Sequence, residues 1–244
     1  MLTVLMQQPA GFGDIMFCLK IASKYVEECG AKVIWPVINE YIWIKDYVHL
    51  NGVEFCSIYD DFEYKNLYNS TYLDVTKVGD CIVIPLQAAW NKYKDGKIME
   101  AKYRIVGMDS RDWHKYFTFT RNRIKENELF VKLGLFDEMD YVLVNKKYAS
   151  PPNTLIYDKM IVPSNKHIVE VDYVEGYNMF DWSKVIENAS EIHMVDSGFN
   201  YIIDKLTLKT NKLYLYPRWG KLTEFELSGL FKTKWIMQNG TDRI

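Results

Sequence analysis

The sequence has 244 residues, of which 48% are hydrophobic and 25% are charged, a composition typical of a folded globular chain. Its 30 basic and 32 acidic residues leave a formal net charge of −2, which disfavours a protein that binds nucleic acid through a basic surface. No apolar run approaches the roughly 20 residues that cross a bilayer, and the first residues lack the basic start of a secretion signal. We therefore expect a cytoplasmic protein with no nucleic-acid partner and no transmembrane segment.

The first half of the chain alternates between apolar strand patterns and helical spacing. Strands are predicted over Leu2–Gln7, Lys32–Val37, Val53–Tyr59 and Cys81–Leu86. Helices are predicted over Ile15–Cys29, with Asp14 as N-cap and Gly30 as the terminating glycine, over Tyr41–Val48, and over Asp112–Leu133, which Gly134 ends. We expect an irregular segment over Asp60–Val78 and a polar, mobile loop over Ala88–Gly96.

The second half repeats this alternation. Strands are predicted over Tyr141–Asn145, His167–Val171, Ile192–Val195 and Lys212–Tyr216, and helices over Asp181–Ala189, Phe199–Leu206 and Leu222–Phe231. Strands that alternate with helices are typical of parallel sheets. The predicted fold class is α/β, with two Rossmann-like domains that face each other across a cleft. We place the domains at residues 1–137 and 138–244, and such clefts are where small ligands bind.

A turn with two glycines follows the first predicted strand. Gly11-Phe12-Gly13-Asp14 joins that strand to a helix, and glycines there let backbone N–H groups approach a ligand closely. The turn lacks the third glycine of the dinucleotide fingerprint, and no acidic residue ends the second strand, so NAD binding is disfavoured. From spacing alone, Asp14 is either a functional carboxylate or an ordinary N-cap.

Polar residues also follow the strands of the second module. Asp196-Ser197-Gly198 comes after one predicted strand, Lys146 after another and Arg218 after a third. Ligands bind outside the carboxyl ends of parallel strands, where N–H groups and basic side chains supply counter-charge to a phosphate. A helix cap and solvated surface charges are the alternatives for these residues.

The remaining arginines, histidines and cysteines do not indicate a metal site. Arg121 and Arg123 could face the cleft, but the spacing of Arg123 and Glu126 is that of an ordinary surface ion pair. The four histidines and four cysteines form no HxH, HExxH or CxxC motif, so no metal site is expected. His193 is expected in the core, and Cys18 and Cys81 are expected to be buried free thiols.

The two turns together resemble a known group of enzymes. Gly11–Asp14 resembles the N-terminal loop of GT-B glycosyltransferases of the heptosyltransferase-like kind, in which an aspartate at this place is the general base. Asp196-Ser197-Gly198 resembles the segment beside the nucleotide sugar in the second domain of that group, although Tyr201 stands where a histidine is usual. The resemblance implies that Asp14 is catalytic. The residues expected to bind the donor are Gly11, Gly13, Asn145, Lys146, Asp196, Ser197, Gly198 and Arg218.

The resemblance also implies a reaction. A compact GT-B enzyme moves a hexosyl or related sugar from a nucleotide-sugar donor to a hydroxyl of a glycan or another acceptor. Inversion at the anomeric carbon is implied, without a metal and without a cofactor other than the donor as co-substrate. Two alternatives stay open: a nucleotide-sugar epimerase-like enzyme, and a non-catalytic protein that binds nucleotides or glycans on the same scaffold.

Overall fold

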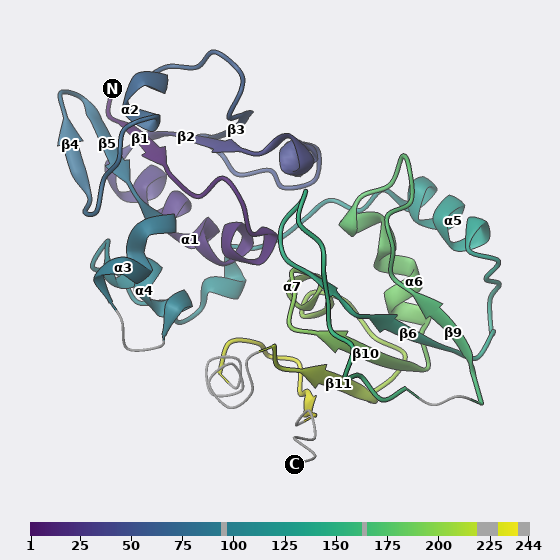
Figure 1. Ribbon diagram of the computed structural model, residues 1–244. Coiled ribbons are helices and arrows are strands. Elements are labelled where there is room, and N and C mark those ends of the chain that lie inside the picture. Colours follow the sequence, from purple (N-terminus) through teal and green to yellow (C-terminus); the bar gives the residue numbers. More distant parts are fainter. Residues whose placement is uncertain (94–96, 163–164, 219–228, 239–244) are drawn as a thin grey trace. The chain divides into compact units, whose positions relative to one another are not determined.

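The computed structural model describes residues 1–93, 97–162, 165–218 and 229–238. The chain divides into two compact units, Met1–Thr120 and Arg121–Ile244 (Figure 1). Each unit contains its own sheet of mainly parallel strands, with helices in the connections. The α/β fold class expected from the sequence is therefore confirmed for each unit.

The sheet of the first unit has the strand order β3-β2-β1-β5-β4, in which only the edge strand β4 runs antiparallel to its neighbour. Its strands are β1 (Thr3–Met6), β2 (Lys32–Val37), β3 (Val53–Ser57), β4 (Thr76–Val78) and β5 (Cys81–Ile84). The central strand β1 is completely buried, because a parallel sheet is covered on both faces. Its carboxyl end, followed by the two-glycine turn, lies between the ends of β2 and β5.

The helical segments of the first unit are dominated by α1 (Phe12–Cys29), whose apolar face enters the core through Ile15, Leu19 and Ala22. Gly30 ends α1 with φ at 59°, a left-handed conformation that favours glycine. The other helical segments are η1 (Asn39–Asp46), α2 (Lys65–Tyr68), η2 (Leu86–Ala88), α3 (Ala89–Lys92), α4 (Ile98–Arg104) and η3 (Trp113–Lys115), where η denotes a 3₁₀ helix.

The sheet of the second unit is entirely parallel and has the order β12-β11-β10-β6-β9. Its strands are β6 (Tyr141–Asn145), β9 (His167–Glu170), β10 (Glu191–Val195), β11 (Leu213–Tyr216) and β12 (Ile236–Met237). A separate antiparallel pair consists of β7 (Lys147–Tyr148) and β8 (Leu155–Ile156). The helical segments are α5 (Arg123–Lys132), η4 (Met179–Trp182), α6 (Ser183–Asn188) and α7 (Phe199–Ile203).

The long helix expected over Asp112–Leu133 is wrong. The chain forms the single turn η3 and then α5, and the segment between them is not helical. Phe117 is buried and stacks on Phe119, and the Thr120 N–H donates to the carbonyl of Tyr47 at 2.7 Å. These contacts in the first unit favour a non-helical backbone in the segment between η3 and α5. The division between units therefore falls at residues 120 and 121, earlier than the expected 137 and 138, and α5 belongs to the second unit.

Several smaller expectations also differ from the structure. Asp14 is not the N-cap of α1, because the helix begins at Phe12 and Gly11 is its N-cap. The expected irregular segment contains α2 and β4, and the expected mobile loop contains α3. The helix expected over Leu222–Phe231 lies mostly outside the described residues.

Candidate active site

The turn after β1 places Asp14 at the carboxyl edge of the first sheet. Gly11 has φ at 80°, and a Cβ atom added there would lie 2.2 Å from Asp14 Oδ2. Only glycine therefore allows this carboxylate to fold back over the turn. The Asp14 side chain is 31% exposed, so its carboxylate is open to solvent. Gly13 is the second residue of α1.

A buried lysine from α4 pairs with this carboxylate. Lys102 is 4% exposed, and its Nζ lies 3.1 Å from Asp14 Oδ1, 2.6 Å from Gln8 Oε1 and 3.3 Å from the carbonyl oxygen of Leu86. We call Gln8, Gly11, Asp14 and Lys102 the Asp14 cluster. Burial raises the pKa of the neighbouring Cys18 thiol to about 12, with the Lys102 charge acting in the opposite direction. The thiol is therefore neutral.

In the second unit, three adjacent strands bring polar side chains together at their carboxyl ends. Asn145 ends β6 and donates through Nδ2 to Ser197 Oγ at 3.0 Å, just after β10. Arg218, just after β11, places Nε 3.0 Å and Nη2 2.9 Å from Asp196 Oδ2. The Arg218 guanidinium also lies over the ring of Tyr148, 5.4 Å from its centroid. We call Asn145, Asp196, Ser197 and Arg218 the Asp196 cluster, and the parallel direction of the strands, which the sequence predicts, brings these residues to one edge of the sheet.

Two residues expected to bind the donor have other partners. The Ser197 N–H donates to Asn200 Oδ1 at 2.8 Å, and α7, which follows Gly198, has only five residues. The Ser197 N–H is therefore already hydrogen-bonded within its own turn. Lys146 forms an ion pair with Glu170 at the end of β9. Tyr201, which replaces the usual histidine, is 5% exposed and packs edge-on against Phe231.

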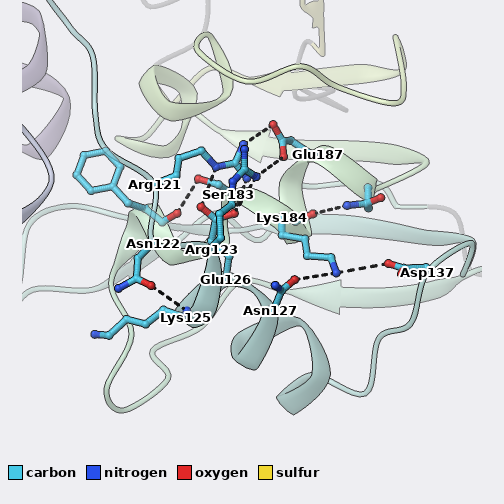
Figure 2. Close-up of polar contacts among 12 residues, drawn as sticks. Arg121, Asn122, Arg123, Lys125, Glu126, Asn127, Asp137, Ser183, Lys184 and Glu187 are labelled. Carbon is cyan, nitrogen blue, oxygen red and sulfur yellow. Dashed lines mark hydrogen bonds and ion pairs between the residues drawn. The ribbon is translucent and has the colours of Figure 1, made fainter.

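The arginines considered for a cleft instead hold α5 against α6 (Figure 2). Arg121 donates to Glu126 through Nε at 2.7 Å and Nη2, and to Glu187 through Nη1 at 2.6 Å. Glu126 is 1% exposed, so this ion pair is largely removed from water. Arg123 is 65% exposed and lies 3.4 Å from Glu126. The Arg123–Glu126 pair expected from the spacing is present, but Glu126 is buried, so it is not an ordinary surface pair. Arg121 has a structural role, and we call these four residues the Arg121 network.

Sequence reasoning missed Lys102. No element was predicted around it, and its partner Gln8 lies 94 residues away in the chain. The one available signal is its spacing, because Lys102 lies three residues before the buried Ile105. On a helix, a position three residues from a buried apolar residue is usually apolar too.

The described residues contain no group of three or more His, Cys, Asp or Glu side chains that could hold a metal ion. Among the helices in the described ranges, none is long and apolar enough to cross a membrane. Cys18 and Cys81 are buried free thiols, as expected.

No protein-family model matches the sequence, and a comparison with curated proteins finds no match. Similar solved structures include a glycosyl transferase of family 9 from Veillonella parvula DSM 2008, with 6% identity, a TM-score of 0.48, and coverage of 88% of this chain and 79% of that one. The iron-containing dodecameric glycosyltransferase TibC from enterotoxigenic E. coli H10407 has 9% identity and a TM-score of 0.48, and the match covers 88% of this chain and 58% of TibC. E. coli heptosyltransferase WaaC with ADP has 11% identity and a TM-score of 0.39, with coverage of 88% and 86%. The chain is thus similar in structure to glycosyltransferases, a heptosyltransferase among them.

Proposed function

We propose that the chain is a glycosyltransferase that moves a sugar from a nucleotide-sugar donor to an acceptor hydroxyl. The observation that carries this proposal is the Asp14 carboxylate, which is partly open to solvent and fixed at the end of β1 by Gly11 and Lys102. A positioned carboxylate of this kind suits a general base. The resemblance of both turns to GT-B enzymes supports the same role.

The reaction assigns a separate task to each cluster. Asp14 takes the proton of the acceptor hydroxyl while the acceptor oxygen forms a bond to the anomeric carbon. The bond from that carbon to the diphosphate oxygen breaks on the opposite side, and the electron pair leaves with the nucleotide, so the configuration inverts. Arg218, oriented by Asp196, supplies positive charge to the leaving diphosphate. In this proposal no metal or cofactor takes part.

Donor binding is tested by a thermal-shift screen with UDP-, GDP- and ADP-sugars. Because a ligand that binds only the folded state stabilises it, a true donor at about 100 times its Kd should add about 2.7 kcal/mol and raise Tm by about 5 °C or more. Arg218→Met should weaken the shift, and Arg123→Met, which removes an exposed arginine of the same unit, should leave it unchanged. A screen without any shift in the wild-type protein would contradict the proposal.

Turnover is tested with the donor found in that screen. Asp14→Asn should keep the thermal shift and lower transfer by about 100-fold or more, because it removes the base and retains the shape of the side chain. Wild-type activity in this variant would remove Asp14 from the mechanism. Donor isomerised without an acceptor would indicate the epimerase-like alternative, and binding without turnover would indicate the non-catalytic one.

A further inference from the structure

Lys102 is unusual because its ammonium is buried. Lysine is almost never fully buried unless its charge is paired, because transfer of an unpaired ammonium out of water is costly. The three hydrogen-bonding directions of the Lys102 ammonium lead to Asp14, Gln8 and the Leu86 carbonyl. With a side chain only 5% exposed, Lys102 is poorly placed to bind a substrate itself.

The surroundings of Lys102 are themselves held in place. Gln8 is 4% exposed, and its side-chain Nε2 donates to the backbone carbonyl of Ala10. The backbone carbonyl of Gln8 accepts the indole N–H of Trp35 at 3.0 Å. The Trp35 bond fixes the backbone, and the Nε2 bond orients the side-chain amide so that its oxygen faces Lys102. Since Leu86 follows β5 and Gln8 follows β1, the ammonium is fixed between the carboxyl ends of two adjacent strands.

The Asp14 carboxylate is in turn positioned by its neighbours. Oδ1 faces Lys102 at 3.1 Å, and a Cβ atom added at Gly11 would lie 2.2 Å from Oδ2. The ion pair with a buried ammonium and the missing side chain at Gly11 together favour this orientation of the carboxylate.

We propose that Lys102 is the positioning residue of the reaction, keeping the Asp14 carboxylate oriented to receive the acceptor proton. This inference rests on the proposed function. Lys102 itself touches neither substrate nor reacting atoms, and acts through Asp14 alone.

The test compares kcat and KM of the wild-type protein, Lys102→Met, Lys102→Gln and Lys102→Arg. Misplacement of the carboxylate should lower kcat by about 10- to 100-fold in Lys102→Met and Lys102→Gln, while KM for the donor stays within about twofold. Lys102→Arg keeps a positive charge that can pair with Asp14 and should restore part of the lost kcat.

Lys97→Met is the matched control, because Lys97 directly precedes α4 and forms an exposed pair with Glu100. It should retain the wild-type kcat and KM, and circular dichroism should verify the fold of every variant. Lys102→Gln can still donate a hydrogen bond, so it serves if Lys102→Met does not fold. Failure of both to fold would make Lys102 a folding residue and overturn the proposal.

The remaining outcomes separate this inference from the proposed function. No turnover by the wild-type protein with any donor overturns both. Turnover that is insensitive to Asp14→Asn removes Asp14, and with it the role of Lys102. Turnover that depends on Asp14, with wild-type kcat in the folded Lys102→Met and Lys102→Gln variants, overturns the role of Lys102 and leaves the transferase intact.

Discussion

At the scale of single residues, His193 is a buried titratable group that the proposed reaction does not use. Its Nδ1 lies 2.9 Å from Tyr216 Oη, its Nε2 lies 2.8 Å from Glu191 Oε1, and its ring stacks on Tyr214 at 4.6 Å. Burial lowers the pKa of His193, and the Glu191 carboxylate acts in the opposite direction without reversing the shift. The folded protein therefore binds this proton less readily than the unfolded chain does.

The stability of the second unit should depend on pH through His193. An unfolded histidine titrates near about 6.5, so as pH falls below that value the unfolded state gains the proton first and the free energy of unfolding decreases. Above that value this contribution is absent, because both states are neutral. Urea unfolding at a series of pH values should show a shallower decrease for His193→Asn than for the wild-type protein. His167→Asn, which changes an exposed histidine on β9, should keep the wild-type slope. Equal slopes in all three proteins would exclude His193 as the source.

The prediction of individual site residues from the sequence depended on the parallel direction of the strands. Asp14, Asp196 and Arg218 could be selected because each follows a short apolar run, and parallel strands bring such positions to one edge. The contact of Lys102 with Gln8 and Asp14 joins segments far apart in the chain, which no local pattern reports. The Ser197 N–H was misjudged for a related reason, since its acceptor Asn200 is a side chain whose direction the sequence does not show.

At the scale of elements, the Arg121 network joins α5 to α6. Arg121 bonds two carboxylates, one at the start of α5 and one on α6, and Lys184 of α6 donates to Asn127 of α5 at 3.0 Å (Figure 2). Because Glu126 is 1% exposed, its charge has little contact with water. Removal of a single partner therefore leaves a buried carboxylate with weaker compensation.

Arg121→Ala should destabilise the packing of α5 on α6 by about 3 kcal/mol, because it uncovers the buried charge of Glu126. Hydrogen exchange measured by mass spectrometry should show faster exchange in peptides that cover α5 and α6. Arg123→Ala removes an exposed partner of the same glutamate and should change stability by less than about 0.5 kcal/mol. Comparable exchange in the two variants would show that burial of the pair does not matter.

Elements were predictable where burial and local pattern agree. The largely apolar runs of β1, β2, β5, β6 and β11 identified those strands, because strands of a parallel sheet are covered on both faces. The prediction for residues 112–133 failed because the helical spacing of apolar residues continues across a stretch where tertiary contacts determine the backbone conformation. Phe117 is buried in the first unit, whereas Arg121 is bonded in the second.

At the scale of the whole molecule, the misplaced helix explains the misplaced boundary. The pattern alone assigns the segment before residue 138 to the first domain, because Gly134 looks like the end of its last helix. In the structure α5 contacts η4 and α6, and Tyr141 at the start of β6 meets Phe130 of α5 at 6.5 Å between ring centroids. The first turn of α5 and the charges around Glu126 thus belong to the core of the second unit.

Two fragments of the chain distinguish these boundaries. Residues 121–244 retain Arg121, α5 and their partners, and should unfold cooperatively on heating, as monitored by circular dichroism. Residues 138–244 lack α5, so Phe130 no longer covers Tyr141 and Glu187 loses Arg121. This shorter fragment should give a broad transition at lower temperature, with fast hydrogen exchange in α6. Residues 1–120 and 1–137 serve as the reciprocal controls and should melt at the same temperature, because α5 adds no core to the first unit. A cooperative 138–244 fragment as stable as 121–244 would place the boundary at 137 and 138 after all, and would reduce the Arg121 network to a surface feature.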